Sequence, residues 1–111
     1  MTLKDLAESR LFEVVNIGDD TDRQITKTYC CDLLSIAMSR APAGCAWVTV
    51  MGNINTLAVA SLSDAACIIL AEGVYLDDAA KSKAIQQDIT VFRTDMPVFE
   101  TALTVHRLLH A

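Results

Sequence analysis

The chain has 111 residues, 52% of them hydrophobic, and carries a formal net charge of −5 at pH 7. This length fits one domain, and an acidic chain without a cluster of Lys or Arg side chains is repelled by nucleic acid and by anionic lipid. No apolar run reaches the roughly 18 residues of a membrane span, and residues 1–10 lack the pattern of a signal peptide. We therefore expect a cytoplasmic protein that binds neither nucleic acid nor a membrane.

Helix and strand patterns alternate in the amino-terminal part of the chain. Thr2 precedes an apolar periodic run and Asp5 follows three residues later, which is the spacing of a capping box at a helix start. Asp32 stands before a second helical pattern, where we expect it to cap the helix. The predicted elements are helices over residues 2–10 and 32–40, strands over residues 11–15 and 25–29, and a polar loop over residues 18–22.

Residues 47–73 have the most informative pattern in the chain. The predicted elements there are a strand over residues 47–51, a polar corner over residues 52–55, an apolar helix over residues 56–62 and a second apolar strand over residues 65–71. Two buried strands joined by a buried helix are typical of a parallel pair, because the helix provides the crossover connection that returns the second strand in the same direction. The corner is then at the carboxyl end of a parallel strand, where open α/β sheets usually bind their ligands.

The carboxyl-terminal part continues the alternation of strands and helices. A helix capped by Asp77 or Asp78 extends to about residue 87, and a short apolar strand covers residues 89–92. Pro97 fits the first turn of a final helix that extends to residue 109. We therefore predict an α/β fold in a single domain over residues 1–111, with a mostly parallel sheet flanked by helices.

Several ordered blocks of the sequence resemble a stand-alone DRTGG domain, over about residues 22–109. The blocks are Asp32-Leu33-Leu34-Ser35, Trp47-Val48-Thr49-Val50, Asn55, Ala58 to Leu62, Ala66 to Leu70, and Glu72-Gly73. In the signature that names this family, Asp22-Arg23 and Thr26 match, whereas Lys27 and Thr28 stand where paired glycines are expected. If the family's glycines supply a turn with positive φ or a close backbone approach to a ligand, Lys27 and Thr28 cannot easily do the same.

The resemblance implies a domain similar to the N-terminal domain of HPr kinase/phosphorylase. Related domains accompany phosphotransacetylases and CBS-domain pyrophosphatases as regulatory or dimer-forming modules, and some small members are associated with hydrogenase-type redox systems. The kinase activity itself does not follow, because the chain contains no G-x-x-x-x-G-K-[ST] motif.

Small polar side chains follow the predicted parallel strands and mark a candidate binding site. We assign ligand binding to Thr49, Asn53, Asn55, Glu72, Gly73 and Thr94, with Asp95 beside them. The ends of parallel strands meet at one edge, and a helix start at Asn53 or Asn55 favours an anion such as phosphate. The alternative is that Asn53 or Asn55 caps that helix while Thr94 or Asp95 caps the last one.

Three other sets of residues have structural explanations that we prefer. His106 and His110 are four residues apart on one side of the last helix but have no third ligand nearby in sequence, so we expect no metal. Cys30, Cys31, Cys45 and Cys67 lie in apolar surroundings that favour reduced core thiols over a nucleophile. Asp32 and Ser35 have the spacing of a helix cap and its first turn.

We expect a non-catalytic regulatory or interaction domain without a cofactor, which forms a homodimer and senses a small anionic or nucleotide-like ligand at the strand-tip edge. An alternative is a passive adaptor subunit of a larger redox, hydrogenase-associated, or signalling complex. A third is a small enzyme that uses Glu72 or Asp95 as a base and Asn53 or Asn55 to hold an oxyanion. The last is disfavoured because both histidines are far along the chain from the proposed site.

Overall fold

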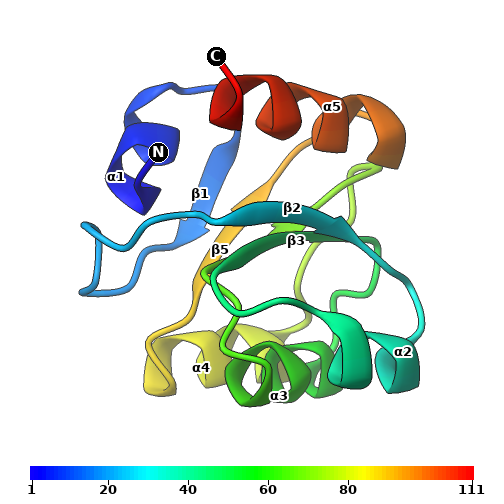
Figure 1. Cartoon of the computed structure of the whole chain (residues 1–111). Coiled ribbons are helices and arrows are strands. Elements are labelled where there is room, and N and C mark those ends of the chain that lie inside the picture. The colour runs from blue at the N-terminus through cyan, green and yellow to red at the C-terminus, as the bar shows by residue number, and fades with distance from the viewer.

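A five-stranded sheet lies between two layers of helices in the computed structural model, which describes residues 1–111 (Figure 1). The helices are α1 (Leu3–Glu8), α2 (Leu34–Arg40), α3 (Ile54–Leu62), α4 (Asp78–Gln86) and α5 (Val98–Leu109). The strands are β1 (Glu13–Asn16), β2 (Lys27–Cys30), β3 (Cys45–Thr49), β4 (Cys67–Leu70) and β5 (Thr90–Arg93). No helix among them is both long enough and apolar enough to cross a membrane.

The strand order in the sheet is β1-β5-β4-β3-β2. Strands β2, β3, β4 and β5 are parallel, and only β1 runs antiparallel, against β5. The β1–β5 register shifts between Val14 and Asn16, which marks an irregularity in that edge strand. The predicted α/β fold with a mostly parallel sheet is therefore confirmed.

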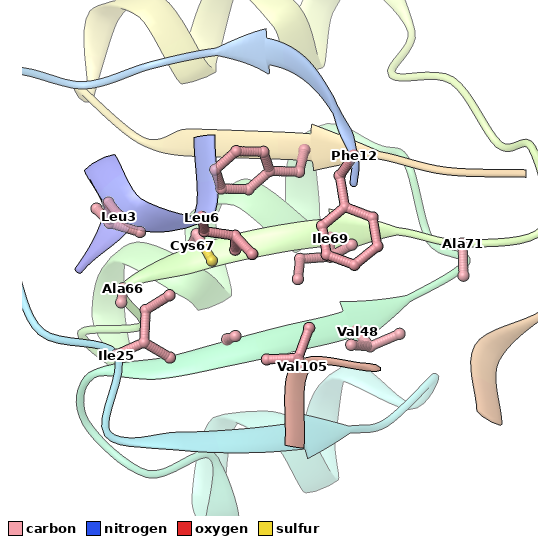
Figure 2. Packing of buried hydrophobic residues seen from close by; sticks show 12 residues of the cluster. Leu3, Leu6, Phe12, Ile25, Val48, Ala66, Cys67, Ile69, Ala71 and Val105 are labelled. Atoms are coloured by element: carbon pink, nitrogen blue, oxygen red, sulfur yellow. The ribbon is translucent and has the colours of Figure 1, made fainter. Parts of the chain in front are cut away.

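Both faces of the two central strands are covered, and every residue of β3 and β4 is buried. On one face, α1 and α5 cover alternate residues of the sheet such as Val48, Ile69 and Phe92 (Figure 2). On the other face, helices α2, α3 and α4 cover Trp47, Ile68 and their neighbours. Successive residues of a strand point to opposite faces, so a strand between two apolar layers must be apolar throughout.

The helix starts agree with the sequence at α1, α3 and α4 but not at α2. Thr2 and Asp5 form the expected capping box, and Asn53 and Asp77 accept hydrogen bonds from the first backbone amides of α3 and α4. The prediction for Asp32 was wrong, because α2 begins after Leu33 with no side-chain cap. The Asp32 carboxylate instead accepts hydrogen bonds from the Thr49 hydroxyl of β3 and from the Val50 amide directly after that strand.

Two leucines of α3 provide a test of how helices α2, α3 and α4 pack against the sheet. Leu57 is fully buried, whereas Leu62, on the same helix, is 72% exposed. We expect Leu57→Ala to lower the free energy of unfolding by about 2–5 kcal/mol through loss of buried area and formation of a cavity. Leu62→Ala is the matched control and should change it by less than about 0.5 kcal/mol in urea denaturation. Equal losses in the two variants would contradict this packing.

Candidate functional site

The carboxyl ends of β3, β4 and β5 meet at one edge of the sheet, which we call the carboxyl edge. Backbone hydrogen bonds tie the three ends together: the Ala71 amide donates to Thr49 (3.0 Å), the Thr94 amide to Leu70 (2.8 Å) and the Gly73 amide to Thr94 (3.0 Å). The residues that we assigned to the site from the sequence therefore lie on neighbouring strand ends and on the loops that leave them.

The residues after β3 are largely engaged in holding the backbone. Thr49 is fully buried, and its hydroxyl donates to the Asp32 carboxylate (2.8 Å) and accepts from the Met51 amide (3.2 Å). The Asn53 side chain accepts from the backbone amides of Asn55 and Thr56 at 3.0 and 3.2 Å, so it caps α3. Asn55 is exposed, and its side chain makes no hydrogen bond within the chain. It is free to contact a ligand.

The residues after β4 and β5 also stabilise the ends of elements. Glu72 has a left-handed backbone (φ 59°), and its carboxylate accepts from the Val98 amide at the start of α5 (2.8 Å). The Thr94 hydroxyl accepts from the Met96 amide (3.2 Å). The alternative in which Thr94 or Asp95 caps the last helix was wrong, because Glu72 supplies this cap from the end of the neighbouring strand.

Arg93, at the end of β5, is the central residue of this edge, and the sequence analysis missed it. Its guanidinium donates to Glu13 of β1 (3.2 Å), to Asp95 (3.0 Å) and to the Gly73 carbonyl (2.9 Å). It also lies 3.7 Å from the centre of the Tyr75 ring. The signal in the sequence was a basic residue directly after an apolar strand, which strand periodicity alone does not mark as functional.

The exposure of the groups around Arg93 is uneven. The Arg93 side chain is 11% exposed, whereas its carboxylate partners Glu13 and Asp95 are 59% and 87% exposed. Desolvation lowers the pKa of Arg93, but the hydrogen bond with Glu13 and the nearby Tyr75 and Asp95 outweigh it and raise the pKa above its ordinary value. The guanidinium is therefore a permanent cation whose carboxylate partners are open to solvent.

The loop that follows β4 packs against the corner that follows β3 at the carboxyl edge. The Asp77 amide donates to the Gly52 carbonyl (3.2 Å), and a Cβ atom at Gly52 would lie 2.5 Å from the Tyr75 carbonyl. A side chain at Gly52 would push this loop away, so the close approach requires glycine. The loop places Tyr75 between the β3 corner and Arg93.

Two cavities lie away from the carboxyl edge. One, of about 140 Å³, is at the opposite edge, beside the amino ends of β4 and β5, and its charged lining residues are Asp20, Arg23, Asp64 and Asp88. Arg23 donates to the Asp64 carboxylate there at 2.9 Å. The second is a groove of about 260 Å³ between β2 and α5.

The histidines and cysteines were the other residues that we considered for metal binding or catalysis. The rings of His106 and His110 lie 4.3 Å apart, and no group of three or more His, Cys, Asp or Glu side chains is placed to hold a metal ion. Burial raises the pKa of the Cys45 thiol to about 11 and raises that of Cys67 further. Partial burial is the main cause that raises the pKa of the Cys30 thiol, and the charges of Asp32 and Cys31 raise it further.

Comparison with known proteins yields a structural likeness alone. None of the known protein families matches the chain, and none of the curated proteins matches it. The structure is similar to a crystal structure of the CBS and DRTGG domains of the regulatory region of Clostridium perfringens pyrophosphatase, in complex with its activator diadenosine tetraphosphate. The TM-score is 0.73 at 16% sequence identity, over 93% of this chain and 44% of that one. At this identity the likeness establishes the fold, and the chain spans less than half the length of the chain in that crystal structure.

The burial of the thiols predicts a simple labelling pattern. Cys45 and Cys67 are fully buried, Cys31 is partly buried and Cys30 is exposed. We expect iodoacetamide at pH 8 to leave Cys45 and Cys67 unmodified in the native protein, as mass spectrometry of peptides would show. In urea all four should react. Rapid native alkylation of Cys67 would contradict the buried position of β4.

Proposed function

We propose that this chain is a non-catalytic regulatory domain that senses a small anionic, nucleotide-like ligand at the carboxyl edge. The fold supports this proposal, because it is shared with the regulatory region of a pyrophosphatase that binds a dinucleotide activator. The position of the site is supported by the parallel strands, whose carboxyl ends usually carry the ligand in open α/β sheets.

The single observation that carries the proposal is the pairing of Arg93. A guanidinium binds phosphate through two parallel hydrogen bonds, as it binds a carboxylate. Asp95 is 87% exposed whereas Arg93 is 11% exposed, so the pair is open to solvent on its carboxylate side, where a phosphate group can take the place of the carboxylate. Arg93 would then exchange a carboxylate of the chain for a phosphate of the ligand.

Two further groups fit a nucleotide at this edge. Tyr75 is 70% exposed although its ring lies against the Arg93 guanidinium, and an exposed aromatic face stacks on nucleobases of any sequence. The free side-chain amide of Asn55 lies on the first turn of α3, where the helix dipole favours an anion. The ligand would therefore extend from the start of α3 across Tyr75 to Arg93.

We further propose a DRTGG-like assignment for the chain, with the family signature in a structural role. Arg23 ties the loop before β2 to Asp64 at the end of α3, and the Thr26 hydroxyl donates to the Ala43 carbonyl (2.8 Å). Lys27 and Thr28, which stand in place of the paired glycines, form the start of β2. The structural neighbour contains a DRTGG domain and supports this assignment, whereas nothing beyond the sequence supports the likeness to HPr kinase/phosphorylase.

A non-catalytic role is favoured over the small enzyme because two of the enzyme's four candidate groups, Glu72 and Asn53, are engaged in capping helices. The Glu72 carboxylate caps α5 and the Asn53 side chain caps α3, so neither is free to act on a substrate. If the chain has a turnover that Asn55→Ala or Glu72→Ala abolishes, the enzyme hypothesis replaces this proposal.

Diadenosine tetraphosphate is the first probe for the proposed site. We expect it to raise the melting temperature of the chain, since a ligand that binds only the folded state stabilises it. Arg93→Gln should weaken binding at least about tenfold, because it removes charge-assisted hydrogen bonds. Asp95→Asn should tighten binding about fivefold, because it removes the competing carboxylate, an effect of about 1 kcal/mol. Isothermal titration calorimetry measures all three dissociation constants.

Two matched controls are needed. One distinguishes binding at the carboxyl edge from binding at the opposite edge, and the other distinguishes the contribution of the base from that of the phosphates. Asp64→Asn removes the carboxylate partner of Arg23 at the opposite edge and should leave the affinity unchanged. Tyr75→Ala should weaken diadenosine tetraphosphate more than inorganic tripolyphosphate, which has no base to stack. The proposal fails if neither probe binds, or if Asp64→Asn changes the affinity while Asp95→Asn does not.

A further inference from the structure

The two edges of the sheet differ in how well they are protected from pairing with another strand. At one edge, β1 has a register irregularity between Val14 and Asn16, and such irregularities disfavour edge-to-edge pairing. At the other edge, β2 pairs with β3 without a register shift, and no strand lies on its outer side. Of the devices that protect an edge strand, β2 has its short length of four residues and the charge of Lys27, but no bulge and no proline.

Exposed apolar side chains flank this open edge on both faces of the sheet. On the α5 side, the groove of about 260 Å³ is lined by Phe99, Ala102 and Leu103, and Phe99 is 69% exposed. On the α2 side, Leu33 and Ile36 are 55% and 43% exposed. Figure 1 shows β2 between α5 on one side and α2 on the other, so one approach to the β2 edge covers both apolar sets.

Thr28 of β2 has a polar group that needs a partner. Thr28 is among the residues that line the groove, and its hydroxyl is shielded from solvent and makes no hydrogen bond within the chain. A buried hydroxyl without a partner is destabilising. In an antiparallel pairing of β2 with a second β2, the two Thr28 side chains lie on the same face and can meet across the two-fold axis.

The charges around β2 suit a second copy of this acidic chain. The whole chain has a net charge of −5, but β2, α2 and α5 together hold three basic residues, Lys27, Arg40 and Arg107, and one acidic residue, Glu100. Of these charges, Glu100 and Arg107 are exposed and of opposite sign, so two copies of α5 can pair them. Glu100 and Arg107 are seven residues, or two turns, apart on α5. Antiparallel α5 helices can thus place each Glu100 against the Arg107 of the other copy.

We propose that β2 pairs antiparallel with β2 of a second copy, so that two molecules form one continuous sheet about a two-fold axis. Such an interface is self-complementary, and the apolar groove lined by Phe99, Ala102 and Leu103 in one copy faces the same groove in the other. The axis lies beside Thr28, with α5 against α5 on one face and α2 against α2 on the other. This surface is separate from the carboxyl edge, so it stands or falls independently of the ligand.

The first test is the mass in solution by sedimentation equilibrium over a range of protein concentrations. The wild-type chain, of 12.0 kDa, should sediment as a dimer at micromolar concentration. Phe99→Asp should weaken dimerisation by at least about thirtyfold, as expected for a central aromatic anchor. Leu62→Asp is the matched control, because Leu62 is as exposed as Phe99 but lies on α3, and it should leave the dimer intact.

The second test is charge reversal, which separates pairing between copies from a role within one chain. Glu100→Arg alone and Arg107→Glu alone should each weaken the dimer, whereas the double variant should restore it because each new charge again meets its opposite. Hydrogen exchange should show that the amides of residues 27–30 become more protected as the protein concentration rises. A monomeric wild-type chain, a dimer insensitive to Phe99→Asp, or concentration-dependent protection at β1 in place of β2 would each overturn the proposal.

Discussion

The burial of two neighbouring strands on both faces is the constraint on which the rest of this structure depends. Strands β3 and β4 expose none of their residues, so helices must cover the sheet on each side. The connections through α3 and α4 cross one face, and they return each strand in the same direction. Parallel strands in turn bring their carboxyl ends to a single edge, where the loops carry the polar side chains. The location of the candidate site is therefore a consequence of how the core is covered.

Most of the polar groups at that edge hold the fold together and are not free for a ligand. Thr49 binds Asp32, Asn53 caps α3 and Glu72 caps α5 from the neighbouring strand. This use of side chains satisfies the backbone groups that helix ends and strand ends leave unpaired. Arg93 is the exception, because it is a nearly buried cation whose carboxylate partners face solvent. The proposed ligand response follows from that difference.

The fold was largely predictable from periodicity and turn residues, because each element has a local cause. The apolar runs around Trp47 and Ile68 and the capping pattern at Thr2 indicated their elements correctly, with ends shifted by a few residues. Asp32 was misassigned because its carboxylate binds Thr49, which is 17 residues away, and local spacing contains no trace of that contact. Arg93 was missed for the same reason, since Glu13 is 80 residues away in the sequence. Contacts of this kind depend on sheet order, which the sequence pattern did not determine.

The most direct measurement is a map of amide chemical shifts during titration with diadenosine tetraphosphate, recorded by nuclear magnetic resonance on the isotope-labelled chain. We expect saturable changes at Asn55, Gly73, Tyr75 and Asp95, the residues around the carboxyl edge, while Arg23 and Asp88 stay unchanged. Changes centred on Arg23 and Asp88 would place the ligand at the opposite edge and contradict the proposed site. A spectrum that does not respond at all would contradict the ligand-sensing role itself.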